Sequence, residues 1–159
     1  MDRCFQKISF EQFKKDIKDD IELYNSYELP KRKTTSSAGY DFIALEDTVL
    51  SPGEIKKIPT GVKVKMLGDE VLFIIVRSSM GFKYNVRLTN QIGVIDSDYY
   101  NNESNEGHIW LSLQNEGDKE FLIKKGDGIS QGIFMKYLTI GDNVDDKRDG
   151  SSSIDGKDD

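Results

Sequence analysis

The sequence predicts an antiparallel all-β domain, because three features of the chain favour that architecture. First, apolar and polar residues alternate in short stretches, as where Val62, Val64 and Met66 are separated by lysines. Second, glycine-containing turn signals separate these stretches at intervals of about ten residues. Third, the chain lacks the regular alternation of strands and helices that builds a parallel nucleotide-binding sheet. The expected architecture is therefore an antiparallel sandwich or barrel.

The composition excludes several classes of protein. The 159 residues are 36% hydrophobic, which suffices for one domain with tails and a core without disulfides. The longest apolar run covers only residues 71–76, and the N-terminus has no apolar signal segment, so neither a membrane span nor secretion is expected. A single cysteine and a single histidine exclude an internal disulfide and a metal site rich in these residues. The net charge of −6 disfavours binding to nucleic acid or anionic membranes, and a cytoplasmic protein is predicted.

The N-terminal extension, residues 1–29, carries one helical signal. Ser9 and Gln12 have the spacing of a capping box. An apolar face then recurs at spacings of three and four residues in Phe10, Phe13, Ile17 and Ile21. These features predict one short helix over about residues 10–19.

The predicted β domain covers residues 30–140. After the alternation at residues 62–66 comes the apolar run 71–76, which reads as a buried strand. Two later strands are predicted from alternating sets, namely Ile109, Leu111 and Leu113, and then Ile129, Ile133, Met135 and Tyr137. Residues 141–159 are polar and rich in Asp, Ser and Gly, so they are expected to form a flexible C-terminal arm.

One stretch of this acidic chain is suited to an anion. Residues 71–95 contain no Asp or Glu, and Arg77, Lys83 and Arg87 give them a charge of +3. Chance clustering on a solvated face is the alternative interpretation. Glycine-rich phosphate loops of the common kinds are absent from the sequence, so a phosphorylated ligand requires another geometry.

Four short polar clusters lie at predicted strand ends or turns, at residues 38–41, 77–79, 93–99 and 126–131. Each one by itself is a weak signal. In the second cluster Arg77 offers a forked donor that suits phosphate oxygens, and two serines follow it.

The carboxylates of these clusters suggest the remaining chemistry. Asp96 follows two apolar residues, where a carboxylate is costly unless it has a function or partners. Asp41 and Asp96, without His or Cys, favour a hard cation held through water, hence Mg²⁺. Tyr99 stands three residues after Asp96 and could pack on a sugar or base. Together these groups predict hydrolysis of a nucleotide phosphate by an activated water.

In this order, the clusters resemble the first four motifs of the trimeric dUTPases, over roughly residues 30–140. The third motif is the most specific, running from Asn90 to Tyr99, with Arg77 nineteen residues before Asp96. The resemblance implies a jelly-roll-like antiparallel β barrel and a homotrimer with three active sites at subunit boundaries. It also implies Mg²⁺-dependent hydrolysis of dUTP to dUMP and pyrophosphate, which lowers dUTP and supplies dUMP for thymidylate synthesis.

The resemblance also implies roles for individual residues. Asp96 would position and deprotonate the attacking water, and Asp41 would hold Mg²⁺ through its water shell. Tyr99 would pack against the deoxyribose and exclude a 2′-hydroxyl. The implied triphosphate ligands are Arg77, Ser78, Ser79, Gln131 and, from the C-terminal arm, Arg148. The implied contacts to the uracil edge are Asn90 and the backbone around Val94 and Ile95.

The chain departs from the family pattern in three places. Residues 100–106 form a longer loop, interpreted as a surface insertion, and Gly128 replaces the usual basic residue of the fourth motif. In the arm, Ser152 stands where the family has a Phe that closes over the base. Loss of this stacking predicts slow catalysis with a raised KM.

Two other functions remain as alternatives. The altered arm is compatible with a weakly or non-catalytic nucleotide-binding trimer that acts through a protein partner. A dCTP deaminase would share the fold, but no matching glutamate motif follows Asp96. Outside the motifs, His108 is expected to be an exposed strand residue. Trp110 is expected either in a subunit contact or in the core.

Overall fold

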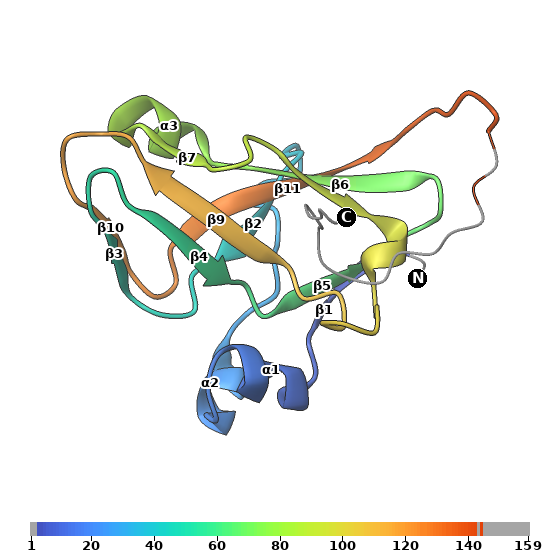
Figure 1. Ribbon diagram of the computed structural model, residues 1–159, viewed down its shortest axis with the longest axis horizontal. Helices are drawn as coiled ribbons and strands as arrows, with labels where there is room; N and C mark the ends of the chain where they lie inside the picture. The colour runs from blue at the N-terminus through green and yellow to red at the C-terminus, as the bar shows by residue number, and fades with distance from the viewer. Residues whose placement is uncertain (1–2, 143, 145–159) are drawn as a thin grey trace.

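The computed structural model describes residues 3–142 and Val144, which form mainly antiparallel strands (Figure 1). The largest sheet contains, in spatial order, β2 (Tyr40–Ile43), β11 (Gly128–Lys136), β6 (Glu70–Ile75) and β8 (Gly93–Asp96). A three-stranded sheet contains β4 (Ile55–Pro59), β9 (Trp110–Asn115) and β7 (Val86–Leu88). The two-stranded sheets pair β1 (Cys4–Lys7) with β5 (Val62–Lys65) and β10 (Phe121–Ile123) with β3 (Thr48–Leu50). The predicted all-β, jelly-roll-like class is confirmed, with its described strands divided among four sheets.

Residues predicted from the two-residue alternation form the main core. Val62, Val64 and Met66 are buried together with Leu111 and Leu113, and the lysines between the first three face outward or are half-buried. Alternate residues of a strand point to opposite faces, so one face of each strand packs inward. The last predicted set was wrong as a single buried face: Ile129 is buried, whereas Met135 and Tyr137 are exposed, because a bulge between Gly128 and Ser130 shifts the register of β11.

The N-terminal extension contains two helices, so the prediction of one helix over residues 10–19 was wrong in its extent. α1 (Phe10–Asp16) begins as predicted, with the Ser9 side chain accepting a hydrogen bond from the Gln12 amide at 3.1 Å. The chain then leaves the helical conformation at Ile17. Asp20 caps a second helix, α2 (Ile21–Ser26). A new cap thus interrupts a periodicity that looked continuous in the sequence.

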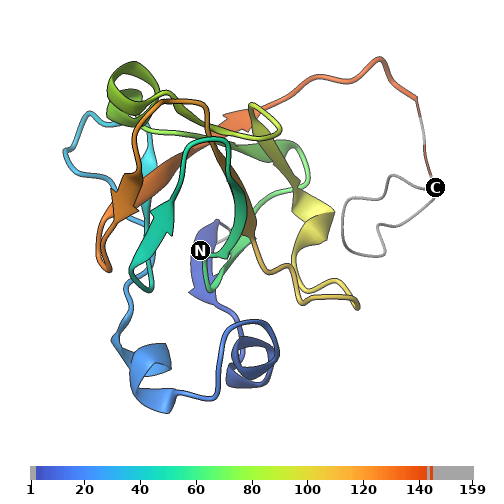
Figure 2. The ribbon, with the colours of Figure 1, turned by 60° about the vertical axis from the view of Figure 1, so that its left-hand side comes forward.

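A strand in this extension was not predicted. Strand β1 pairs antiparallel with β5, and Phe5 contacts the rings of Phe42 and Phe134. An ion pair between Arg3 and the buried Glu70 lies beside it. Figures 1 and 2 both place α1 and α2 together at one end of the strand body. The extension is therefore joined to the β domain by sheet pairing as well as by helix packing.

His108 is fully buried, which corrects the expectation of an exposed strand residue. Its Nε2 accepts a hydrogen bond from the Gly61 amide at 2.9 Å, and its Nδ1 lies 2.6 Å from Asp16 Oδ2. Since Nε2 acts as an acceptor, the ring proton is on Nδ1 and is donated to Asp16. Burial lowers the pKa of His108 and outweighs the opposing effect of Asp16. The neutral imidazole thus connects α1 to the β domain.

We expect the free energy of unfolding to fall as the pH drops from 7.5 to 5.5. The unfolded chain binds a proton at His108 near its ordinary pKa, whereas the folded chain does not until its lower pKa is reached. Between these two pKa values one proton changes stability by at most about 1.4 kcal/mol per pH unit. Urea unfolding at fixed protein concentration measures this slope. His108→Gln should be less stable at both pH values but should have a smaller slope; an unchanged slope would contradict the assignment.

Candidate active site

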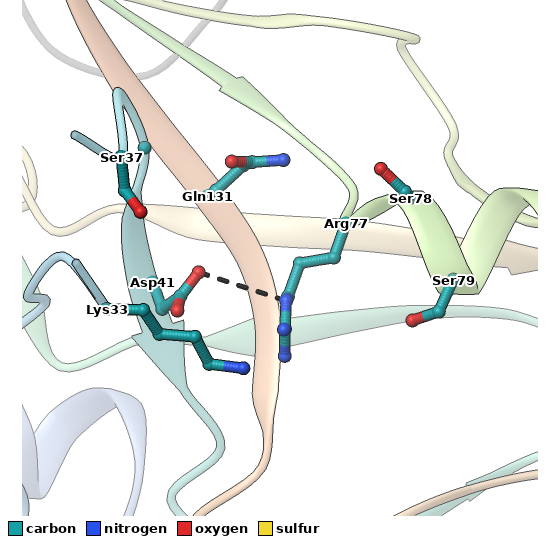
Figure 3. Close-up of a pocket in the computed structure, with 8 residues that line it drawn as sticks. Lys33, Ser37, Asp41, Arg77, Ser78, Ser79 and Gln131 are labelled. Carbon is teal, nitrogen blue, oxygen red and sulfur yellow. Dashed lines mark ion pairs between the residues drawn. The ribbon is translucent and has the colours of Figure 1, made fainter.

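All residues predicted for the site except Arg148 line two separate cavities of the chain. The first has a volume of about 370 Å³ and lies where β2, β11 and the start of α3 (Ser78–Tyr84) meet (Figure 3). Its walls combine polar and charged side chains with one glycine. The lining residues are Lys33, Ser37, Gly39, Asp41, Arg77, Ser78, Ser79 and Gln131.

Charged groups face one another across this first cavity. Arg77 Nε lies 3.8 Å from Asp41 Oδ1, and the Asp41 side chain is only 15% exposed. Figure 3 shows the Lys33 ammonium and the Arg77 guanidinium extending into the same space. No ion pair to Lys33 is found among the described residues, whereas Arg77 and Asp41 largely neutralise each other. The cavity therefore has an available positive charge for a multiply charged anion.

Two glycines make this arrangement possible. A Cβ on Gly39 would overlap the side chain of Gln131, so the absence of a side chain lets Gln131 lie against the loop before β2. A Cβ on Gly128 would lie 2.8 Å from Arg77 Nη1. The absence of a side chain at residue 128 therefore leaves room for the Arg77 guanidinium.

The second cavity is larger and less polar, with a volume of about 930 Å³. It lies along β8, the following turn η1 (Ser97–Tyr99) and the start of β9. Val94 is 57% exposed here, and Trp110 is 40% exposed, so Trp110 is not a core residue. Five residues predicted for the site lie in its walls: Asn90, Val94, Ile95, Asp96 and Tyr99. Apolar side chains beside a half-buried carboxylate suit a base and sugar next to a reacting phosphate.

A single chain does not bring Asp41 and Asp96 together. Strands β2 and β8 form opposite edges of the four-stranded sheet. Asp96 pairs with Val71 at one end of β6, whereas Gln131 and its neighbour Asp41 align with Ile75 at the other end. The spacings of strands and residues place the Cα atoms of these two residues roughly 20 Å apart. Within residues 3–142 and Val144, no group of three or more His, Cys, Asp or Glu residues could cage a metal ion.

The loop at residues 100–106, interpreted as a surface insertion, is tied to the N-terminal extension and to strand β5. Asn102 is buried, and Glu106 accepts hydrogen bonds from the Ser9 amide at 2.5 Å and the Ser9 hydroxyl at 2.7 Å. Lys63 Nζ lies 3.2 Å from Glu106 Oε1. The predicted arm residues Arg148 and Ser152 lie outside the described residues.

Sequence reasoning missed several lining residues of these cavities, among them Lys33, Ser37 and Asn105. Lys33 belongs to a basic run at residues 31–33, which precedes the first motif and lies outside the four polar clusters. Ser37 precedes the first motif, and its place at the cavity was not anticipated. Asn105 lines the second cavity from the inserted loop, and no spacing signal in the sequence could have identified it.

Comparisons with known proteins identify the family to which the chain is similar. A family model described as dUTPase matches residues 25–156. The deoxyuridine 5'-triphosphate nucleotidohydrolase of Lactococcus lactis is 48% identical over 122 residues, which cover 76% of this chain and 81% of the relative. No helix in the described part of the chain is long and apolar enough to cross a membrane.

Solved structures show the same fold. The crystal structure of dUTPase from Streptococcus mutans has a TM-score of 0.70 and 39% identity, and the match covers 87% of this chain and 98% of that one. A mutant dUTPase from phage phi11 of S. aureus has a TM-score of 0.65 at 18% identity, covering 91% of this chain and 97% of that one. The latter protein is described as coordinating a structural Mg(II) ion.

Proposed function

The chain belongs to the dUTPase family, and we propose on this premise that it hydrolyses dUTP to dUMP and pyrophosphate. The observation that carries the proposal is that the residues of the four described motifs line two cavities, one with phosphate donors and one with a carboxylate beside apolar walls. The relatives described above are all named as dUTP hydrolases, and nothing in these comparisons supports a non-catalytic nucleotide-binding protein or a deaminase. We place the reaction in the cytoplasm.

We propose that two copies of the chain complete each site within a homotrimer. Polar groups must converge to hydrogen-bond distance to act on one nucleotide, whereas Asp41 and Asp96 of one chain lie roughly 20 Å apart. Exposed apolar side chains beside the second cavity, including Ile92 and Val94, favour contact with another copy. Light scattering should report a mass of about three times 18.1 kDa. An active monomer would contradict the shared site.

The chain's own residues account for the main chemical steps. Asp96 accepts a proton from water, whose oxygen then forms a bond to the α-phosphorus of dUTP. The bond between the α-phosphorus and the α–β bridging oxygen breaks, and pyrophosphate leaves with the electron pair of that bond. Arg77, Ser78, Ser79 and Gln131 of another copy hold the triphosphate and offset the charge that develops on the leaving group. Arg148 is proposed as a further phosphate ligand from the resemblance alone.

The first cavity fits a magnesium–triphosphate. Mg²⁺ is usually bound by one or two carboxylates, several waters and substrate phosphates, and does not need a cage made only of protein. Asp41 offers such a carboxylate in the first cavity, which is named the phosphate cavity, and the ion pair with Arg77 holds this carboxylate in place. When bound, Mg²⁺ would orient the triphosphate and reduce its charge.

Pyrophosphate release tests the proposed function directly. With Mg²⁺ present, dUTP should be hydrolysed, with little action on UTP, dCTP or dTTP, and EDTA should abolish the reaction. Hydrolysis of dUTP and UTP at equal rates would contradict the role proposed for Tyr99. Binding of dUTP without any release of pyrophosphate would favour the non-catalytic alternative instead.

Lys33→Ala is expected to raise KM for dUTP by about threefold to tenfold, the effect of losing one charge-assisted contact at an exposed site. The reason is that Lys33 supplies positive charge to the phosphate cavity without an ion-pair partner among the described residues. Lys31→Ala is the matched control, because Lys31 is paired with Glu28 at 2.7 Å and does not line the cavity. Equal effects of both substitutions on KM would show a general charge effect and no contact by Lys33.

A further inference from the structure

The hydroxyl of Tyr99 is held from two sides in the second cavity. It donates a hydrogen bond to the His108 carbonyl at 3.0 Å and accepts one from Asn105 Nδ2 at 2.7 Å. Both Tyr99 and Asn105 line this cavity together with Asp96. The position of the tyrosine ring therefore depends on a residue of the inserted loop.

The orientation of the Asn105 amide follows from its other hydrogen bonds. Its Oδ1 accepts from Asn102 Nδ2 at 2.9 Å and from the Gly107 amide at 3.1 Å. With the oxygen engaged by two donors, the NH₂ group must face the Tyr99 hydroxyl. Asn102 is itself buried and donates to the Tyr99 carbonyl at 2.8 Å. The loop thus presents one donor in a defined direction.

The same loop is anchored to the N-terminal extension. Glu106, next to Asn105, accepts two hydrogen bonds from Ser9, the residue that caps α1. Burial raises the pKa of Glu106, but the bonds from Ser9 and Lys63 outweigh burial and leave the pKa below its ordinary value. A charged Glu106 therefore holds the base of the loop in place at neutral pH.

We propose that Asn105 is a positioning residue that fixes the ring of Tyr99 and thereby strengthens discrimination against ribonucleotides. This inference rests on the proposed function, in which Tyr99 packs against the deoxyribose. A 2′-hydroxyl placed against the ring face would lose its hydrogen bonds to water unless the ring moved away. Movement of the ring breaks the hydrogen bonds of the Tyr99 hydroxyl to Asn105 and to the His108 carbonyl. Each of these hydrogen bonds therefore raises the free energy needed to bind a ribonucleotide.

The test compares binding of dUMP and UMP, with Trp110 as the probe. Trp110 is the single tryptophan of the chain and lines the same cavity, so its fluorescence reports nucleotide binding without hydrolysis. Wild-type protein should bind dUMP more tightly than UMP. Asn105→Ala should reduce this preference about 2- to 10-fold, the value of one hydrogen bond. Ser104→Ala is the matched control from the same loop, since its side chain is exposed and does not line the cavity.

A double-mutant cycle separates positioning from loss of the loop structure. If Asn105 acts through the Tyr99 hydroxyl, Tyr99→Phe should reduce the preference by a similar factor, and adding Asn105→Ala should change it little further. The inference would be overturned if Asn105→Ala kept the wild-type preference for dUMP over UMP. It would also be overturned if the effects of Asn105→Ala and Tyr99→Phe on this preference were fully additive. Absence of dUTP hydrolysis by wild-type protein would instead contradict the proposed function.

Discussion

Replacement of Asp96 by asparagine is expected to lower kcat for dUTP by about 10²- to 10⁴-fold, the usual contribution of a general base. Asp96 ends β8, is half-buried and lines the second cavity beside Tyr99. Asparagine has nearly the same shape, so the fold and the binding of dUMP should change little. The amide cannot accept the proton of the attacking water, so the loss should appear in kcat and not in binding.

Asp98→Asn is the matched control for this prediction. Asp98 lies two residues further along the chain in η1, is exposed and does not line the second cavity. Its substitution removes the same charge and should leave kcat within a few-fold of wild type. Pyrophosphate release gives kcat for both variants, and Trp110 fluorescence gives dUMP binding. An Asp96→Asn variant that retains a third or more of the wild-type kcat would show that Asp96 is structural.

Arg77→Ala is expected to lower kcat/KM for dUTP by about 100-fold or more, because two charge-assisted hydrogen bonds to phosphate are each worth about 1.5–3 kcal/mol. The substitution also leaves the Asp41 carboxylate without its cationic partner in the phosphate cavity. That carboxylate would then repel the triphosphate, which adds to the loss. Steady-state kinetics with dUTP measure the effect.

Two further substitutions define the role of Arg77. Lys83→Ala removes an equal charge from the same acid-free stretch but at an exposed position outside both cavities, and should leave kcat/KM nearly unchanged. Arg77→Lys keeps the charge and loses the forked geometry, so its effect should be intermediate. If Lys83→Ala were as harmful as Arg77→Ala, the overall charge of the stretch would explain the loss, and a direct phosphate contact would not be needed.

Mixing the two inactive variants tests the shared site. Arg77→Ala subunits keep Asp96, and Asp96→Asn subunits keep Arg77. In mixed trimers of the two variants, some sites therefore combine an intact Asp96 of one subunit with an intact Arg77 of another. Each mixed trimer contains both kinds of subunit, so about one of its three sites has both contributions intact, and the purified mixed trimers should show about a third of the wild-type rate. Co-expression of the two variants with different tags, followed by purification on both tags, gives the mixed species. No recovery would show that each chain contains its own complete site.

Much of the fold could be predicted from local patterns. The alternation at residues 62–66 and 109–113 identified buried strand faces, because a strand places alternate side chains on one side whatever it pairs with. The cap at Ser9 was also correct, since a capping box involves groups only three residues apart. The same locality explains the error that followed, where Asp20 starts a second helix within an apparently continuous periodicity.

Features that depend on residues distant in the sequence were not predictable in this way. Strand β1 gives no alternation signal of its own and becomes a strand by pairing with β5, about 60 residues later. His108 looked like an exposed strand residue, yet it is buried and hydrogen-bonded to Asp16 and Gly61, which lie 92 and 47 residues away. Asn105 gained a role only because the folded loop aims its amide at Tyr99.

The sequence by itself determined which side chains are proposed for the chemistry, because each motif concentrates its donors or carboxylates within a few residues. The tertiary structure decided which of them meet. The order β2-β11-β6-β8 places Asp41 with Arg77 and Gln131 near one end of the sheet, and Asp96 with Tyr99 at the opposite edge. The order of the motifs along the chain does not reveal the distance between Asp41 and Asp96. The order of strands in this sheet depends on pairing between strands that are distant in the sequence.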